Sequence, residues 1–338
     1  MFLRTIQQDV FHQVIPSRPM GKYAHIVILR ETSSFALFRT ELELNFAKVS
    51  AGRSIQRLSP IISRIVLYKR KQTSPERLTG RELLRRYNLI SESRDNAELR
   101  YCEYNSEHFC KHCPDCIYYG FAIGQEGSEK SKIMVDSAFS LPHFDEARQT
   151  MTFNAPYEHG TMSLHGELKH SLGEQDHVLP QIFFPSIETI RDPTEPEFLY
   201  VLNNILRTRR YGAQTTRAGT VENHIAAIIF ADGEIFSNLK LTQALYDWLQ
   251  SESQTQPPAN AYQAANLLIG IHEVLPTLLK EDSVVVHLQL EGLQLKMLLA
   301  EVNGLLTNES KLLLLLREAY AECDIYSKTF GAGSKSKK

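Results

Sequence analysis

The apolar positions of this chain follow two different periods, which together predict a protein built from both strands and helices. Runs rich in Val, Ile, Phe and Tyr have the length of β-strands and end at turn residues. Such runs predict strands at residues 24–30, 35–42, 61–68, 117–123, 131–139, 181–190, 221–230 and 284–290. The first two of these could also form one long bent strand.

Other segments repeat their apolar residues every three or four positions, which is the period of an amphipathic helix. Residues 195–207 are the clearest case, with Phe198, Val201 and Ile205 on one face. Thr79 can cap a short basic helix, with Glu82 three residues later completing a capping box. Helices are predicted at residues 79–87, 195–207, 239–249, 259–279 and 312–321. Mixed strands and helices without an internal repeat indicate the α+β class.

Two segments fall outside this pattern. Residues 141–180 are rich in Pro, His and Gly and contain only short alternating pieces, which predicts an extended hairpin and not a second core. The last residues, 331–338, consist of Gly, Ala, Ser and Lys and are expected to be disordered. No apolar run approaches membrane-helix length, and the N-terminus lacks a secretion signal, so we expect the cytoplasm.

The composition is that of an ordinary globular protein, but the charge is unevenly distributed. The net charge is −2, whereas residues 53–86 carry +8 and residues 231–330 carry −7. Residues 201–220 contain four arginines and no acid. Basic surface attracts polyanions, because neutralising phosphates drives nucleic-acid binding. Charge alone leaves open that these are solvated faces that meet no partner.

Four of the five cysteines lie close together and predict a metal site. They are Cys102, Cys110, Cys113 and Cys116, with His108 as an alternative ligand. Zinc takes about four such ligands, and disulfides are rare in the cytoplasm. An iron–sulfur cluster or free thiols are the alternatives. Because four cysteines would leave no open coordination position for a substrate, we expect structural zinc.

A loop containing glycine and arginine follows the helix at 195–207. Glycine lets a backbone approach a ligand closely, arginine offers a forked donor to phosphate, and Tyr211 offers a ring for base stacking. The loop residues of interest are Arg209, Arg210, Tyr211, Gly212, Gln214, Thr215, Arg217 and Gly219. A glycine loop that ends a helix needs no ligand, so the pattern alone leaves both interpretations open.

These stretches together make the chain recognisable. Residues 113–124, Cys-Pro-Asp-Cys-Ile-Tyr-Tyr-Gly-Phe-Ala-Ile-Gly, resemble the segment that leads into a core strand of CRISPR RAMP-superfamily proteins. Residues 131–139 resemble the next strand, and Glu188 with residues 210–219 matches the later strand and glycine loop. The chain is most similar to the backbone-subunit family of type I-D Cascade, whose zinc-binding insertion agrees with the cysteine cluster. The resemblance is weakest in the C-terminal helices.

The resemblance implies one RAMP-type domain over residues 1–330 with a modified RRM (ferredoxin-like) palm. The palm core would comprise about 23–90, 117–140, 181–230 and 283–290, with a zinc-binding finger insertion at 91–116, a thumb hairpin at 141–180 and helices at 239–326. Copies of such a subunit would line guide RNA (crRNA) as a helical filament. Its other partners would be the target DNA or RNA strand and the large, 5′-end capping, repeat-processing and small subunits.

The resemblance also assigns contacts to this chain. Guide phosphates would meet Arg53, Arg57, Arg64, Lys69 and the loop at 209–219. The thumb would wedge into the guide–target duplex with Phe144, Met151, Phe153 or Met162, unless these residues pack internally. Specificity for RNA would come from backbone shape and 2′-hydroxyls, which leaves the bases free to pair.

We expect no catalysis from this chain. Type III relatives cut RNA with an aspartate after the first strand, whereas residues 44–75 contain no Asp or Glu. Asp136, Asp145 and several histidines remain, but general acid–base catalysis needs groups that converge on one atom, and the sequence shows none. The alternatives are an RNA endonuclease that cuts at spaced positions and a single-copy RNA-binding protein outside CRISPR defence.

Overall fold

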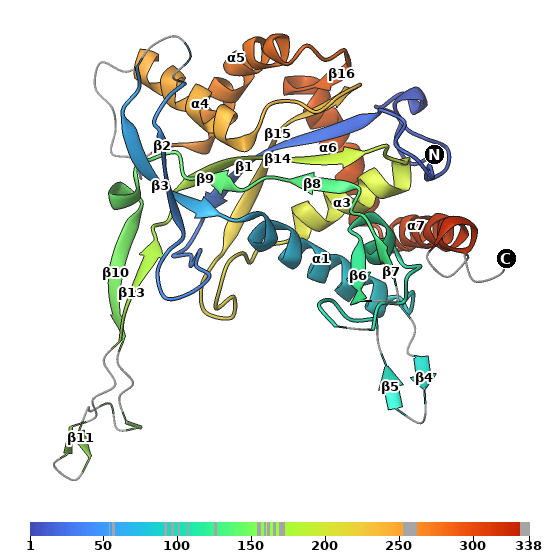
Figure 1. Ribbon diagram of the computed structural model, residues 1–338, viewed down its shortest axis with the longest axis horizontal. Helices are drawn as coiled ribbons and strands as arrows, with labels where there is room; N and C mark the ends of the chain where they lie inside the picture. Colours follow the sequence, from blue (N-terminus) through green and yellow to red (C-terminus); the bar gives the residue numbers. More distant parts are fainter. Residues whose placement is uncertain are drawn as a thin grey trace.

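A computed structural model of the chain gives the architecture in Figure 1. The structure describes residues 1–53, 55, 58–90, 93–95, 98–100, 102–106, 108–124, 127–153, 157–158, 160, 163–164, 167–168, 173–252 and 262–331. Over these residues it is a mixed α+β protein with antiparallel sheets and seven α-helices, which confirms the predicted class. Within the described residues, no helix has both the length and the apolar content that crossing a bilayer requires.

A five-stranded antiparallel sheet forms the centre, with the strand order β16-β15-β1-β14-β8. Its strands are β1 (Tyr23–Thr32), β8 (Ile133–Val135), β14 (Phe183–Arg191), β15 (Val221–Ala231) and β16 (Val286–Leu290). Four of them alternate along the chain with two helices in the sequence β1-α1-β8-β14-α3-β15, where α1 is Lys69–Arg86 and α3 is Glu195–Arg207. The long strands were predicted correctly because both their faces are buried, which makes them continuous apolar runs.

Helices cover both faces of this sheet. Ala24, Ile26 and Ile28 of β1 pack with α1, α3, α6 (Gly292–Leu306) and α7 (Glu309–Phe330). Val27 and Leu29 point the other way, toward α4 (Asn238–Glu252) and α5 (Ala264–Asp282). Neighbouring residues of a strand face opposite sides of the sheet, so one strand serves both cores. Figure 1 shows α4 and α5 on one side of the sheet and α1 and α3 on the other.

A smaller sheet and a projecting hairpin extend from one side of the body. The smaller sheet has the order β2-β3-β9, from Phe46–Ser50, Ile61–Leu67 and Ala138–Phe139. The hairpin consists of β10 (Arg148–Phe153) and β13 (Gly173–Val178), with the two residues of β11 (Ser163–Leu164) and of β12 (Glu167–Leu168) further out. The predicted excursion at 141–180 therefore contains a hairpin that points away from the body in Figure 1. A third core beneath the smaller sheet includes Phe38, Ile65 and Phe184.

The cysteine-rich segment packs beside α1 and α7. It contains the one-turn helix α2 (Pro114–Tyr118) and the hairpins β4–β5 (Ser93–Asp95, Glu98–Arg100) and β6–β7 (Phe121–Ile123, Gly127–Glu129). Cys102, Cys113 and Cys116 belong to the same core cluster as Leu315 and Leu316 of α7. The C-terminal helices thus support this segment directly.

Four predicted elements differ from the observed ones. Residues 131–139 are divided between β8 and β9, which belong to different sheets. Residues 35–42 form isolated bridges and no strand, and residues 117–123 are divided between α2 and β6. The predicted capped helix at 79–87 is the second half of α1, which begins at Lys69. The Thr79 hydroxyl donates to the carbonyl oxygen of Pro75, four residues earlier, and does not cap a helix. The expected disorder at 332–338 lies outside the described residues.

A buried carboxyl group on α7 makes stability depend on pH. Glu322 accepts hydrogen bonds from the hydroxyls of Thr194 (2.6 Å) and Tyr118 (2.5 Å). Burial raises the pKa of Glu322 to about 7. A carboxyl whose pKa is higher in the folded state favours folding while it is protonated, and this contribution disappears as the pH rises through the folded pKa.

We therefore expect the free energy of unfolding to fall between about pH 4.5 and pH 7, by an amount on the order of 1–3 kcal/mol from this group. Urea unfolding at pH 5 and pH 8 measures the difference. Glu322→Gln, which keeps an acceptor but cannot ionise, should reduce it. An equal pH dependence in the variant and the wild type would contradict this assignment.

Candidate nucleic-acid interface

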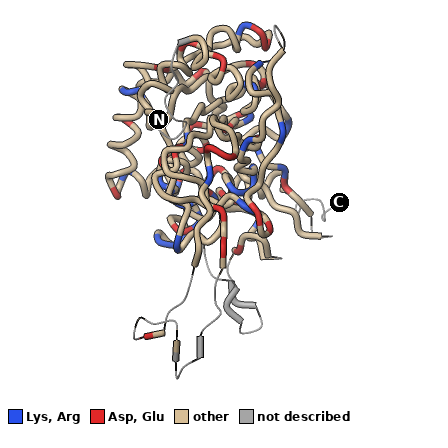
Figure 2. Tube along the Cα trace, turned by 90° about the vertical axis from the view of Figure 1, so that its left-hand side faces the viewer, with Lys and Arg blue, Asp and Glu red and all other residues tan. Residues whose placement is uncertain are grey.

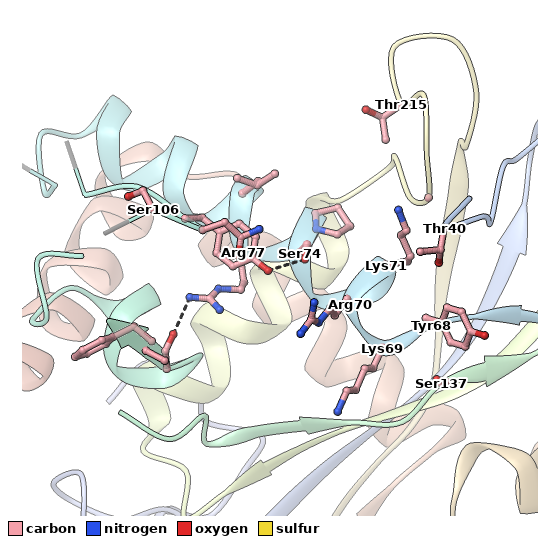
Figure 3. Close-up of a pocket in the computed structure, with 18 of the residues that line it drawn as sticks. Thr40, Tyr68, Lys69, Arg70, Lys71, Ser74, Arg77, Ser106, Ser137 and Thr215 are labelled. Carbon is pink, nitrogen blue, oxygen red and sulfur yellow. Dashed lines mark hydrogen bonds between the residues drawn. The ribbon is translucent and has the colours of Figure 1, made fainter. Parts of the chain in front are cut away.

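A large open cleft runs between the start of α1, the cysteine-rich segment and the loop after α3. Its volume is about 1380 Å³. Among the described residues that line it, four are basic and none is acidic; the basic ones are Lys69, Arg70, Lys71 and Arg77. Figure 3 shows Lys71 beside Thr40, with Lys69 and Arg70 extending from the other side of the helix start. Figure 2 shows acidic and basic residues mixed over the body, so this uniformly basic lining is local.

The loop at 209–219 reaches the cleft through Gly212 and Thr215. Gly212 has φ +90°, and a Cβ there would lie 2.6 Å from the carbonyl oxygen of Leu37. Gly219 has φ +85°, and a Cβ there would lie 2.2 Å from the carbonyl oxygen of Tyr211. These glycines are required by the close approach of the backbone to itself. Their effect is to close the loop tightly and leave its polar tip exposed.

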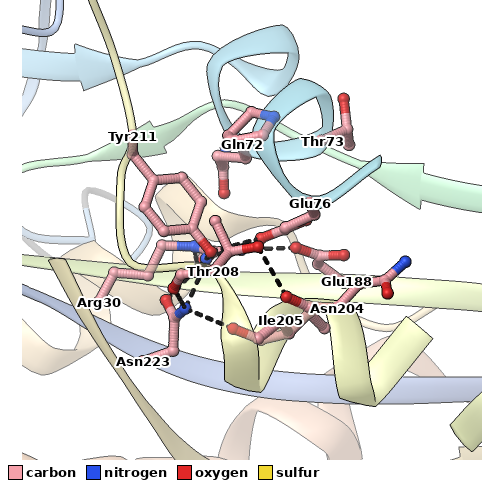
Figure 4. A network of polar contacts seen from close by, with 12 residues as sticks. Arg30, Gln72, Thr73, Glu76, Glu188, Asn204, Ile205, Thr208, Tyr211 and Asn223 are labelled. Carbon is pink, nitrogen blue, oxygen red and sulfur yellow. Dashed lines mark hydrogen bonds and ion pairs between the residues drawn. The ribbon is translucent and has the colours of Figure 1, made fainter. Parts of the chain in front are cut away.

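A buried polar network beneath the cleft joins the loop, α1 and the sheet (Figure 4). Arg30 of β1 pairs with Glu188 (2.5 Å) and Glu76 (3.1 Å) and donates to the hydroxyl of Tyr211 (3.0 Å). That hydroxyl donates to Glu76 at 2.8 Å. Burial raises the pKa of Glu188 well above its usual range, and repulsion from Glu76 adds to the shift. One arginine of the sheet thus contacts two buried carboxyl groups. It also fixes α1 and the loop after α3, which both line the cleft.

The four predicted cysteines form one cluster. The Sγ atoms of Cys102, Cys110, Cys113 and Cys116 all lie within 4.8 Å of one another. The Sγ of Cys116 is 3.5 Å from that of Cys102 and 3.8 Å from that of Cys110. Sulfur atoms at the corners of a tetrahedron around zinc, each about 2.3 Å from the metal, are about 3.8 Å apart. The residues can therefore hold a metal ion.

The surroundings shift the pKa values of the four thiols in opposite directions. Hydrogen bonding with Cys102 raises the pKa of Cys113 and that of Cys116 well above the usual range. Hydrogen bonds from the other three thiols, above all from that of Cys102, lower the pKa of Cys110. The backbone N–H of Cys110 donates to the Sγ of Cys102 at 3.3 Å. His108 is exposed and is not part of the cluster, so the structure favours the four cysteines as ligands.

Comparison with known proteins places the chain in a family. Residues 10–316 match the Csc2 CRISPR family, which is most of the sequence. The chain belongs to the Csc2 CRISPR family. No curated protein sequence matches it. The family assignment agrees with the resemblance to CRISPR backbone subunits that the sequence indicated.

One solved structure supports the same fold. The crystal structure of Csc2 from Thermofilum pendens matches with a TM-score of 0.59 at 14% identity, over 98% of this chain and 95% of that one. A chain from a structure described as a CRISPR RNA-guided surveillance complex matches with a TM-score of 0.44 at 10% identity, over 78% of this chain and 87% of that one. The first match shows that this chain has the fold of Csc2.

The structure brings together only part of the RNA-binding set predicted for this Csc2-family chain. Lys69 and the loop residues Gly212 and Thr215 line the same cleft. The exposed side chains of the loop surround its tip: Arg209, Arg210, Gln214, Thr215 and Arg217. Gly219 is buried and acts through the backbone.

Two predicted contacts do not belong to the cleft. Arg64 is fully buried and donates to the carbonyl oxygens of Ser140 and Ala51, so it holds the smaller sheet and is closed to phosphate. Arg53 pairs with Glu281 of α5 at 2.6 Å and lines a separate pocket beside α4. Arg57 lies outside the described residues.

Tyr211 was predicted to stack on a base, and the structure corrects this prediction. Its side chain is fully buried, and its hydroxyl belongs to the network around Arg30. The ring is therefore an anchor for the loop. The local sequence could not reveal this, because its partners Glu76 and Arg30 are distant along the chain.

The predicted wedge residues differ in their accessibility. Phe144 packs at the hairpin base, 5.3 Å from the ring of Phe46, so it is an internal contact. Met151 is half-buried on β10, whereas Phe153 is 44% exposed where the described part of the hairpin ends. Met162 lies outside the described residues. Phe153 is thus the described candidate that a nucleic acid can reach.

The lining residues that the sequence analysis missed include Arg70, Lys71, Arg77 and Tyr104. Arg70 and Lys71 follow Lys69 directly, and this run of three cations was a visible signal. These three residues directly follow the strand predicted at 61–68, and the next helix was expected to begin only at residue 79. Arg77 and Tyr104 carried no such signal, because only folding brings the cysteine-rich segment against α1.

Proposed function

We propose that this chain binds the sugar-phosphate backbone of guide RNA in a type I-D CRISPR effector complex and presents the guide for pairing without cutting it. The observation that carries the proposal is the large cleft, in which every charged lining residue that the structure describes is basic. A cleft of this size exceeds what a single small ion needs. Lysine and arginine side chains neutralise phosphates, which supplies most of the affinity in sequence-independent nucleic-acid binding.

The position of the three cations at the helix start supports an anionic ligand. The first turn of α1 contains no acid, and the N-cap residue Tyr68 makes no side-chain capping bond. Cations at a helix N-terminus are unfavourable, because the helix dipole is already positive there. A phosphate chain would remove this repulsion, because a helix N-terminus favours an anion.

We further propose that the central sheet is a modified RRM-like palm and that the β10–β13 hairpin is its thumb. The support for the palm is the element sequence β1-α1-β8-β14-α3-β15 with the strand order β15-β1-β14-β8, which is the ferredoxin-like arrangement. The support for the thumb is its projection from the body and the exposed ring of Phe153. The cysteine cluster would hold structural zinc in a finger region, because four sulfur ligands suit that ion.

A binding role without catalysis agrees with the arrangement of acids and histidines in the described part of the chain. The lining of the large cleft contains neither an acid nor a histidine. Asp136 is exposed in a smaller pocket that Lys69, Arg70 and Arg77 also line, and Asp145 pairs with Arg148 at the hairpin base. His159, His165 and His170 lie outside the described residues. Acid–base cleavage needs groups that converge on the scissile phosphate.

Isolation of the protein from cells that contain a CRISPR array tests the proposal. We expect co-purified small RNAs of uniform length with repeat-derived ends, and size-exclusion chromatography should show several copies of the chain per RNA. Labelled RNA complementary to the guide should be recovered intact after incubation with magnesium.

Other outcomes of these experiments would favour other functions. Cleavage of complementary RNA into a ladder would favour a spaced endonuclease. A monomer on RNA would favour a single-copy binding protein. A heterogeneous RNA pool, or none, would count against a guide-binding role.

A further inference from the structure

A continuous set of buried contacts begins at the cysteine cluster. Arg81 of α1 donates from Nη1 to the carbonyl oxygen of Cys102 at 2.7 Å, and the same nitrogen lies 3.4 Å from the Sγ of Cys102. Its Nε donates to the carboxylate of Asp115 at 2.7 Å. Arg81 and Asp115 are both fully buried, so water does not weaken these charged contacts.

The contacts continue from Asp115 into the wall of the cleft. Arg77 donates to the two carboxylate oxygens of Asp115 at 2.9 and 2.8 Å, and to the carbonyl oxygen of Gly120 at 2.9 Å. Its guanidinium lies 4.5 Å from the ring centre of Tyr104, whose hydroxyl is 2.8 Å from that of Ser74. Arg77, Gly120, Tyr104 and Ser74 all line the cleft.

Asp115 is the residue on which this arrangement depends. Arg77 and Arg81 are one helical turn apart on α1, so their like charges repel unless an acid lies between them. Asp115 pairs with both and so reduces this repulsion, and the loss of one partner in a buried ion pair is strongly destabilising. It lies in the single turn of α2, between Cys113 and Cys116. The geometry of the cysteines therefore sets the position of the acid that orders the cleft wall.

We propose that Asp115 and Arg77 are positioning residues that couple metal binding at the four cysteines to RNA binding in the cleft. This inference rests on the proposed RNA-binding function and adds a regulatory link to it. Loss of the metal would release Cys102 and α2, and with them the carboxylate that holds Arg77 and Tyr104 in the wall. The metal would thus set the affinity of the cleft for RNA without contacting the RNA.

The first test compares zinc-loaded and zinc-stripped full-length protein. The probe is a fluorescein-labelled oligouridine RNA, and fluorescence anisotropy gives its Kd. We expect the stripped protein to bind about tenfold more weakly, with recovery when zinc is restored. Circular dichroism of the stripped protein checks that the rest of the chain stays folded.

The second test uses the reciprocity of linked equilibria. If zinc strengthens RNA binding by a given factor, RNA must strengthen zinc binding by the same factor. Competition for zinc with a chromophoric chelator, with and without the RNA, measures this directly. A purely structural metal site would release the same fraction of zinc in both cases.

The third test is Asp115→Asn, which keeps all four cysteines and the shape of the side chain. The variant should retain zinc at the wild-type ratio, bind RNA about as weakly as the stripped protein, and show a zinc–RNA coupling factor near one. The matched control is Asp282→Asn. It removes the carboxylate at the end of α5 that pairs with Lys240 of α4. Its coupling factor should equal that of the wild type.

A milder variant serves if Asp115→Asn does not fold. Ser74→Ala removes only the last hydrogen bond of the series, and we expect it to lower the coupling factor about threefold. Equal RNA affinity of loaded and stripped wild-type protein, or an unchanged coupling factor in these variants, would overturn the inference and leave RNA binding intact. Absence of RNA binding even in the loaded protein would overturn the proposed function itself.

Discussion

Replacing Lys69, Arg70 and Lys71 together with alanine is expected to weaken the binding of single-stranded RNA about a hundredfold at low salt. Lys69 and Arg70 are exposed, and all three line the cleft with no acidic residue beside them in its lining. Each phosphate contact contributes about 0.7 to the slope of log K against log salt for a single strand, so the slope should fall by about two. Anisotropy titrations at several salt concentrations measure both quantities.

A matched variant separates this local effect from a general loss of charge. Lys296, Lys311 and Arg317 are three exposed cations on α6 and α7, and none of them lines the cleft. Their replacement with alanine removes the same charge and should change RNA affinity by less than about threefold. If both triple variants lose affinity equally, the RNA follows the overall charge of the molecule and the cleft is not its site.

The sequence revealed most where its pattern had a single cause. The strands β1, β14 and β15 are buried on both faces, and their continuous apolar runs are therefore typical of buried strands. The cysteines were recognisable because four sulfur ligands within fifteen residues have few other uses. β2 was missed because it is a half-exposed strand with no apolar pattern. The helix α6 was not among the predicted helices either.

The limits of prediction at the site have a common physical origin. Arginine serves equally well on a surface and in a buried ion pair, so the sequence could not separate Arg64 from Lys69. The predicted start of this helix rested on the capping-box pattern of Thr79 and Glu82, and this displaced it past the three cations at the true start of α1. The contacts that decide these cases join residues far apart in the chain, and no local pattern contains them.

The buried network beneath the cleft leads to the second large effect. Arg30 is fully buried between Glu188 and Glu76 and also supports Tyr211. Arg30→Met removes the one cation that compensates these acids within the network. Breaking a buried ion pair on one side costs about 3–5 kcal/mol, because the remaining charge has lost its partner. Urea unfolding at neutral pH should show a loss of this size.

Two further variants distinguish charge from packing. Arg148→Met breaks a half-exposed pair with Asp176 and should cost less than about 1 kcal/mol. Adding Glu76→Gln and Glu188→Gln to Arg30→Met removes the uncompensated carboxyls and should restore much of the stability. If Arg30→Met costs no more than Arg148→Met, these carboxyl groups do not depend on the charge of Arg30. The raised pKa of Glu188 would then keep that carboxyl neutral in the folded protein, and Tyr211 would be held by hydrogen bonds alone.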